Sequence, residues 1–174
     1  MSIDLKILQN AIFDWAALVM KGTIPEEKIF WREQSAHTPP RPSVGLKILF
    51  GPDRFGSFDS TCVVDGKCIV GGQRMFTISV NTFGKTSISH PFAYQAGIDL
   101  HASLTRPSIL QELRSNGIAV QLIEQVQDIS FVEETEYEER SAFEFKINVA
   151  SNVEDQPGFI ETVDTINGSF PNKK

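Results

Sequence analysis

The sequence is poor in the residues from which metal centres and disulfide frameworks are built. Its 174 residues include two cysteines and three histidines. Cys62 and Cys68 flank an Asp-Gly pair at 65–66, which predicts a two-residue hairpin turn. That turn would pair Val63 with Cys68 and Cys62 with Ile69, so the two sulfurs would lie on opposite faces of the ribbon. A disulfide is disfavoured by this geometry, and two cysteines without neighbouring histidines cannot form a zinc site. We therefore expect free thiols and no metal or cofactor.

Long hydrophobic runs and an excess of basic residues are also missing. The longest apolar stretch, at 11–20, is about half the length of a membrane span and contains Asp14. It has neither the basic start nor the cleavage site of a signal peptide, so we expect a protein that is not secreted and does not enter a membrane. The 16 Lys and Arg against 22 Asp and Glu leave a net charge of −6. Sequence-tolerant binding to nucleic acid needs a basic footprint, which this balance disfavours.

Each catalytic or nucleotide-binding motif that the sequence partly matches lacks a required residue. Gly-Lys-Thr at 84–86 follows a predicted strand, but a phosphate-binding loop needs a glycine five positions earlier, where Ser79 stands. The three histidines show no metal-binding spacing. A triad could be assembled from His101, Asp99 and a serine, but no Gly-x-Ser-x-Gly nucleophile elbow occurs. We therefore expect a protein that is not an enzyme, and we keep a small hydrolase using His101 and acidic residues as an alternative.

The residues that are present predict an α+β fold. Hydrophobic residues make up 41% of the chain and charged residues 22%, as in globular proteins. Apolar residues alternate with polar ones in three segments, as in antiparallel strands with one buried face. Spacings of three and four residues predict helices elsewhere. The predicted strands are at 44–50, 76–82 and 143–149, with shorter or weaker strand patterns at 28–32 and 118–131, and the predicted helices are at 3–20, 92–104 and 107–117.

The segments add up to one domain and one arm. We expect residues 1–150 to form a single α+β domain, with an antiparallel sheet packed on the N-terminal helix and a helical pair. A hairpin at 58–72, bracketed by glycines, is expected to project from the body as a flap. Residues 151–174 show no periodicity and are expected to form an extended C-terminal arm.

An acidic run is the main charge feature. Five glutamates occur within seven residues: Glu133, Glu134, Glu136, Glu138 and Glu139. One interpretation is a solvated acidic edge that discourages strand pairing. The other is an acidic surface facing something that must not adhere, such as passing nucleic acid. The run itself does not decide between them.

Several landmarks, in their order and spacing, resemble the neck or tail-terminator (tail completion) proteins of tailed bacteriophages. The resemblance covers nearly the whole chain, although the hairpin with the two cysteines has no counterpart in the family pattern. The landmarks are WREQ at 31–34, PRP at 40–42, FTISVNTFG at 76–84, NGI at 116–118, EERSAF at 138–143 and PGFIETV at 157–163.

The resemblance implies a structural protein without catalytic residues. Proteins of this kind are small α+β domains that assemble into a ring, usually a hexamer, at the head–tail junction of the virion. The ring would be assembled in the bacterial host cytoplasm. It would cap the tail tube, fix its length and meet the head connector or stopper protein, and double-stranded DNA would pass through its hole. Such a ring repeats one heterologous interface around its axis.

These implications assign provisional roles to particular residues. The five glutamates of the acidic run would face the lumen of the ring, where they would repel DNA. Contacts with a neighbouring subunit or another partner are expected at Trp31, Pro40, Arg41, Pro42, Phe159 and Ile160. Two alternatives stay open besides the hydrolase. One is another head–tail connector of the neck, and the other is a peptide-binding module with residues 39–42 in its groove.

Overall fold

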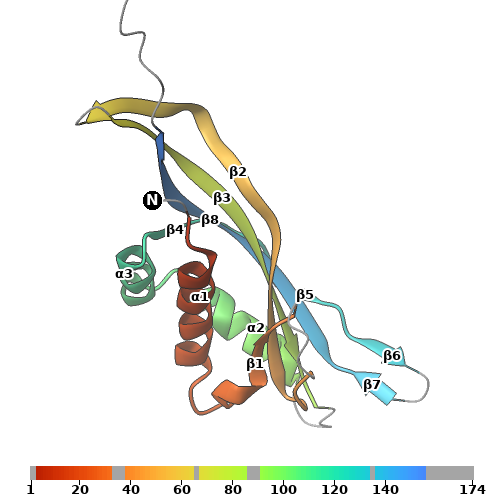
Figure 1. Cartoon of the computed structure of the whole chain (residues 1–174). Coiled ribbons are helices and arrows are strands. Elements are labelled where there is room, and N and C mark those ends of the chain that lie inside the picture. The colour runs from red at the N-terminus through yellow and green to blue at the C-terminus, as the bar shows by residue number, and fades with distance from the viewer. Residues whose placement is uncertain (1–2, 33–37, 65–66, 86–90, 134–135, 156–174) are drawn as a thin grey trace, which may run out of the picture.

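The computed structural model describes residues 3–32, 38–64, 67–85, 91–133 and 136–155. The helices of this part of the chain all cover one face of a long curved sheet (Figure 1). The helices are α1 (Leu5–Met20), α2 (Phe92–Ser103) and α3 (Pro107–Ser115), with a 3₁₀ turn at Glu26–Lys28. The strands are β1 (Ile29–Trp31), β2 (Ser43–Val64), β3 (Lys67–Phe83), β4 (Ile118–Ile123), β5 (Gln127–Asp128), β6 (Phe131–Glu133), β7 (Glu136–Glu138) and β8 (Arg140–Asp155).

Local sequence signals set the ends of the helices. The Asp4 carboxylate accepts hydrogen bonds from the first backbone N–H groups of α1, and Gly22, at φ +88°, follows its end. Pro107 occupies the first turn of α3, and Gly117, at φ +75°, follows its last residues. The three helices expected from the sequence are therefore confirmed.

The main sheet has the order β1-β2-β3-β8-β4, and β5 pairs with β8 beyond the end of β4. The pairs β2–β3, β3–β8 and β4–β8 are antiparallel, whereas β1 runs parallel to β2. The three alternating segments lie at the start of β2, at the end of β3 and in the first part of β8, where these strands pair with one another. The predicted α+β class with an antiparallel sheet is therefore confirmed.

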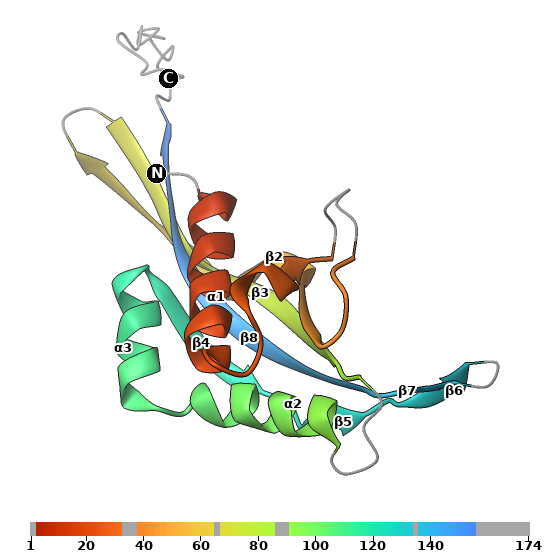
Figure 2. The same cartoon turned by 90° about the horizontal axis from the view of Figure 1, so that it is seen from below.

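The hydrophobic core is formed by side chains of the helices and of the sheet face that they cover. Figure 2 shows the arrangement of these helices against the sheet from below. The side chain of Trp15 on α1 is 2% exposed, and its ring meets Phe145 of β8 edge-on at a centroid distance of 5.4 Å. The Trp15 Nε1 donates a hydrogen bond to the Oγ of Ser103 at 2.9 Å. One side chain thus ties α1 to the sheet and to the end of α2. Other core residues are Leu8, Ile12, Val44, Leu46, Phe76, Ile78, Val80, Leu100, Leu104, Phe143 and Ile147.

The predicted flap is the outer end of a continuous ribbon. β2 runs without a break from the core to the hairpin turn, and its pairing with β3 shifts register three times between Ile48 and Ser60. Such irregularities bend a strand and increase its twist. The predicted turn register is confirmed, because Val63 pairs with Cys68 and Cys62 with Ile69, and both thiols are free.

Two boundaries differ from the sequence analysis. The single strand expected at 118–131 is wrong, because the chain there forms β4, β5 and the start of β6. The Asp128 carboxylate accepts hydrogen bonds from both the backbone N–H and the hydroxyl of Ser130, which supports a turn between β5 and β6. β8 continues to Asp155, so it includes the first five residues of the segment assigned to the arm. Residues 156–174 lie outside the described part of the chain.

Candidate assembly surfaces

The acidic run is divided between a projecting hairpin and the body of the protein. β6 and β7 form a separate two-stranded sheet that extends beyond the main sheet, opposite the β2–β3 turn (Figure 1). Glu133 and Glu136 are the last register pair before its turn. Glu134 lies outside the described residues. At the base of the hairpin, the Glu138 carboxylate forms an ion pair with Arg41.

Glu139 is buried within the subunit, so its assignment to a surface that lines the lumen is wrong. Its side chain is 5% exposed, and its Oε1 accepts a hydrogen bond from the backbone N–H of Ala93 at 2.9 Å. Ala93 lies in the first turn of α2, where backbone N–H groups lack helical partners and favour an anionic acceptor. The carbonyl oxygen of Glu139 also accepts from the N–H of Gly84 at 2.9 Å. Glu139 therefore joins the start of β8 to the start of α2 and the end of β3.

Burial raises the pKa of the Glu139 carboxyl above its ordinary value; the hydrogen bond from Ala93 opposes this shift, and the nearby Asp128 charge adds to it. The folded protein then holds this proton more tightly than the unfolded chain does. The contribution of Glu139 to the free energy of unfolding should therefore fall as pH rises from about 4.5 through the raised pKa.

We expect Glu139→Gln to remove this pH-dependent component. The stability of the original protein relative to the variant should be greatest in acid and decline towards neutral pH, as measured by urea unfolding at a series of pH values. The same substitution at Glu112, an exposed residue of α3, is the control. A relative stability that rose with pH would contradict this prediction.

The predicted contact residues fall into separate environments. Trp31 is 7% exposed and belongs to the core, so its assignment to a partner surface is wrong. Its position in β1 explains the burial, since the pattern of that strand is buried, half-buried, buried. Pro40 and Arg41 are exposed and Pro42 is half-buried. Phe159 and Ile160 lie outside the described residues.

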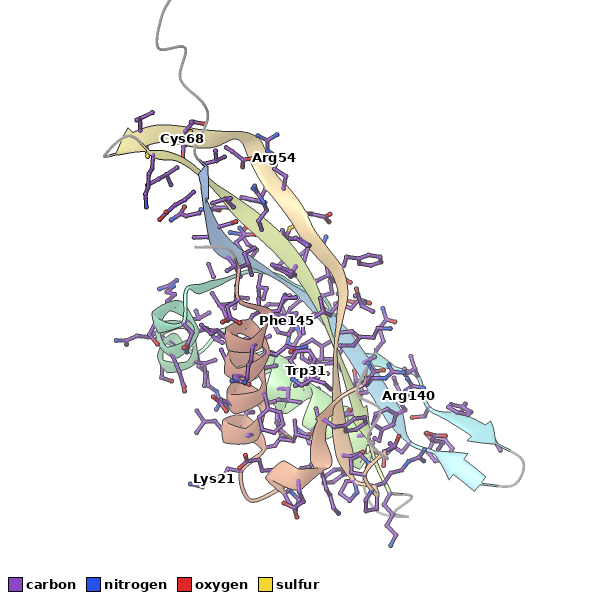
Figure 3. The ribbon with its side chains drawn as sticks, in the orientation of Figure 1. Lys21, Trp31, Arg54, Cys68, Arg140 and Phe145 are labelled. Carbon is purple, nitrogen blue, oxygen red and sulfur yellow. The ribbon has the colours of Figure 1, made fainter. Side chains whose placement is uncertain are left out.

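A cluster of three arginines lies at the base of the β6–β7 hairpin, which we call the arginine cluster: Arg32, Arg41 and Arg140. The guanidinium groups of Arg41 and Arg140 lie over the ring of Phe83, at 5.9 and 5.0 Å from its centroid. The Nη2 of Arg140 donates to the Oδ1 of Asn81 at 3.0 Å, whereas its Nε is buried and has no hydrogen-bond partner. Figure 3 shows Arg140 where β8 leaves the sheet towards the hairpin.

Burial and like charges both act on Arg140 in this cluster. The pKa of Arg140 is lowered, first by burial and then by the positive charges of Arg32 and Arg41, while Glu138 acts in the opposite direction. Among the described residues, Glu138 is the one carboxylate in an ion pair with the cluster. Sequence reasoning singled out Arg41 but missed Arg32 and Arg140 as its neighbours. Both lie within the family landmarks, but only the pairing of β1, β2, β3 and β8 brings them together.

The β6–β7 hairpin also exposes apolar side chains. Val132 is 67% exposed, and Tyr137, its cross-strand partner, is 47% exposed. Phe131 is 41% exposed. A two-stranded hairpin outside the core is at best marginally stable in water, and contiguous exposed apolar side chains are typical of contact surfaces. The hairpin therefore has the composition of a docking element.

The opposite end of the ribbon is held by ion pairs. Arg74 binds both carboxylate oxygens of Asp59, at 2.7 and 3.2 Å, and Arg54 approaches the same carboxylate at 3.3 Å. The hydrogen bond from Arg74 is the main cause that lowers the pKa of Asp59; burial opposes the shift, and the charge of Arg54 adds to it. Exposed apolar side chains also occur here, at Val63 and Val153. Both ends of the sheet thus carry surfaces suited to protein contacts.

The residues considered for catalysis are engaged elsewhere. The His101 ring packs edge-on against Phe143 at 5.6 Å, and the Asp99 carboxylate accepts a hydrogen bond from the side chain of Gln95 at 3.0 Å. No group of His, Cys, Asp and Glu suited to a metal ion occurs among the described residues.

In the same part of the chain, no helix has the length and apolar content needed to cross a membrane.

The fold is a two-layer α+β domain that presents a projecting hairpin at one end and an exposed ribbon at the other. The family model described as phage neck terminator protein matches residues 6–174, so the chain belongs to this family. A search of curated proteins found no match. Membership makes the protein a structural component of the phage neck, in contact with other tail and head components.

Proposed function

We propose that this protein forms a closed homo-oligomeric ring, a hexamer by resemblance, that terminates the tail tube and joins it to the head connector. The family match over 6–174 is the observation that carries the proposal. The shape of the chain supports it, because a ring needs surfaces at two different places on each subunit. The β6–β7 hairpin and the outer end of the ribbon lie at opposite ends of the sheet (Figures 1 and 2).

Open strand edges offer a second means of contact. Beyond the start of β4, where Ile118 pairs with Val149, β8 continues to Asp155 with β3 as its partner on one side. The other edge of this stretch has no partner strand among the described residues. Such an edge can accept a strand from another chain through backbone hydrogen bonds. The exposed Pro40 and Arg41 lie on the loop before β2 and are further proposed contacts with neck partners.

Passage of double-stranded DNA through the ring is part of the proposal. The net charge of −6 suits a channel wall that must release DNA rather than retain it. The proposed function is to cap the tail tube and to bind the head connector, so no catalytic residue is proposed.

The proposal is tested by electron microscopy of lysates from a particle-producing strain in which this gene is deleted. A terminator predicts full heads separated from tails of irregular or excess length. Tails of normal length that fail to join heads would instead indicate another head–tail connector. Normal infectious particles would contradict both roles. A plasmid copy of the intact gene is the control and should restore joined particles.

A further inference from the structure

A groove lies where the start of α1 meets the start of β4 and the outer part of β8. It has a volume of about 260 Å³ and is open to solvent. Small-molecule sites usually measure about 300–1,000 Å³, so this groove suits single side chains rather than a whole ligand. Figure 1 shows the start of α1 beside β8 and β4. The apolar residues that line the groove are Ile3, Ile7, Leu8, Ile118, Val149 and Ala150.

Exposed apolar side chains continue this surface along the sheet. Ile7 is 51% exposed at the groove, and Val153 of β8 is 50% exposed. Because side chains alternate between the two faces of a strand, Val149 and Val153 share a face of β8 with the core residue Ile147. The apolar face of the sheet therefore extends past the part that the helices bury, and contiguous apolar surface of this kind is typical of contact sites.

The strand edge beside the groove is open among the described residues. β4 pairs with β8 as far as Val149, and from Ala150 to Asp155 the recorded partner of β8 is β3. The backbone groups on the other side of this stretch are available to an added strand. An apolar groove beside an open edge suits an extended peptide, because the edge supplies backbone hydrogen bonds and the groove accepts alternate side chains.

The rest of the chain contains a segment of the required kind. Residues 156–174 lie outside the described residues and follow directly on β8. Their sequence includes FIETV at 159–163, whose aromatic and β-branched residues are typical of strands. In an extended conformation Phe159 and Val163 would share one face, with Ile160 on the other. The family match includes this segment.

The position of the segment favours the groove of another copy over the groove of its own chain. To reach its own groove, the chain would have to reverse after Asp155. Pro-Gly at 157–158 favours a type II turn, whose twist does not match a two-residue β-hairpin. A reversal there would also leave Phe159 and Ile160 beside the end of β8. Val149 at the groove lies about 20 Å further back along the strand.

We propose that residues 159–163 of one copy add a strand to the open edge of β8 in the next copy, with Phe159 or Ile160 in the groove beside Ile7. This inference rests on the homo-oligomer in the proposed function and assigns one of its contacts. Each copy gives one segment and receives another, so the contact is heterologous and repeats around a ring.

Disulfide cross-linking in the full-length chain tests both the contact and its source. Two versions with tags of different mass both carry Cys62→Ser and Cys68→Ser. One version also has Ile7→Cys, and the other has Phe159→Cys or, separately, Ile160→Cys. Because neighbouring residues of a strand face opposite sides, oxidation of the mixture should give a heterodimer as the main cross-linked product for at least one of the two positions.

Leu18→Cys in place of Ile7→Cys is the matched control, since Leu18 is 49% exposed on the same helix but does not line the groove. The cross-linking is repeated on particles from the deletion strain expressing both versions, which covers a chain that is monomeric until it meets the tail tube. Heterodimer yields no greater than the control in both settings would overturn the inference. A cross-link that forms only within a chain carrying both cysteines would also overturn it, because the segment would then occupy its own groove.

Removal of the apolar side chains tests the energetic contribution of the segment. Phe159→Ser with Ile160→Ser should weaken self-association at least ~10-fold, the loss expected when the anchoring side chains of an interface are removed. Native mass spectrometry and light scattering over a dilution series measure this, and the yield of infectious particles in the deletion strain should fall. Phe170→Ser, later in the same segment, is the matched control and should have no effect. If Ile7→Gln lowers the particle yield but the segment variants do not, another protein fills the groove and the inference is wrong.

The experiments separate failure of the contact from failure of the proposed function. Heterodimers from a protein whose deletion leaves normal infectious particles would retain the contact and contradict the terminator role. Tails of irregular length in the deletion strain, together with no heterodimer, would retain the function and place the contact between copies elsewhere.

Discussion

Replacing Trp15 with alanine is expected to lower the free energy of unfolding by about 3–5 kcal/mol, the usual cost of removing a buried aromatic side chain. Trp15 is 2% exposed and contacts the ring of Phe145. Its removal would leave a cavity between α1 and the sheet and would break the hydrogen bond to Ser103. A domain of this size has a total stability of about 5–15 kcal/mol, so the variant should lie close to the limit of folding.

The effect is measured by urea unfolding at protein concentrations that give the same oligomeric state. Leu18→Ala is the matched control, because Leu18 is on the same helix but 49% exposed. It should cost less than about 1 kcal/mol. Trp15→Phe should lie between the two, since it keeps an aromatic ring but loses the indole N–H. A loss below about 1 kcal/mol for Trp15→Ala would show that α1 is not held to the sheet as described.

Gly51→Ala is expected to destabilise the protein by about 2–4 kcal/mol, a large effect for the addition of one methyl group. Gly51 has φ +128°, a conformation that residues with a Cβ rarely adopt. An added Cβ would lie 2.6 Å from the Cδ1 of Phe76 and 2.9 Å from the carbonyl oxygen of Met75. Phe76 is a core residue, so the ribbon cannot relax at this point without disturbing the body.

Gly56→Ala separates backbone strain from collision. Gly56 is in the same strand and has φ +91°, but an added Cβ would meet nothing within 4 Å. It should therefore cost only the backbone term, about 1–2 kcal/mol. The two variants are compared by thermal and urea unfolding. Equal losses would mean that the close approach of β2 to Phe76 does not contribute.

The elements that depend on near neighbours in the chain follow from the sequence alone. The helices are marked by spacing and by residues such as Pro107 and Gly117, and the turn between β2 and β3 by an Asp-Gly pair. These signals act within a few residues, so no knowledge of the fold is required to interpret them. The order of the landmarks was also sufficient to predict the family that the comparison established.

Only the tertiary structure decided the roles of the individual charged residues. Glu138 and Glu139 are adjacent in one acidic run, yet the first pairs with Arg41 and the second lies buried against the start of α2. Their environments depend on partners 97 and 46 residues away in the sequence, respectively. The same is true of the arginine cluster, whose members come from three separate parts of the chain. Burial and charge neighbours are set by packing, and composition shows neither.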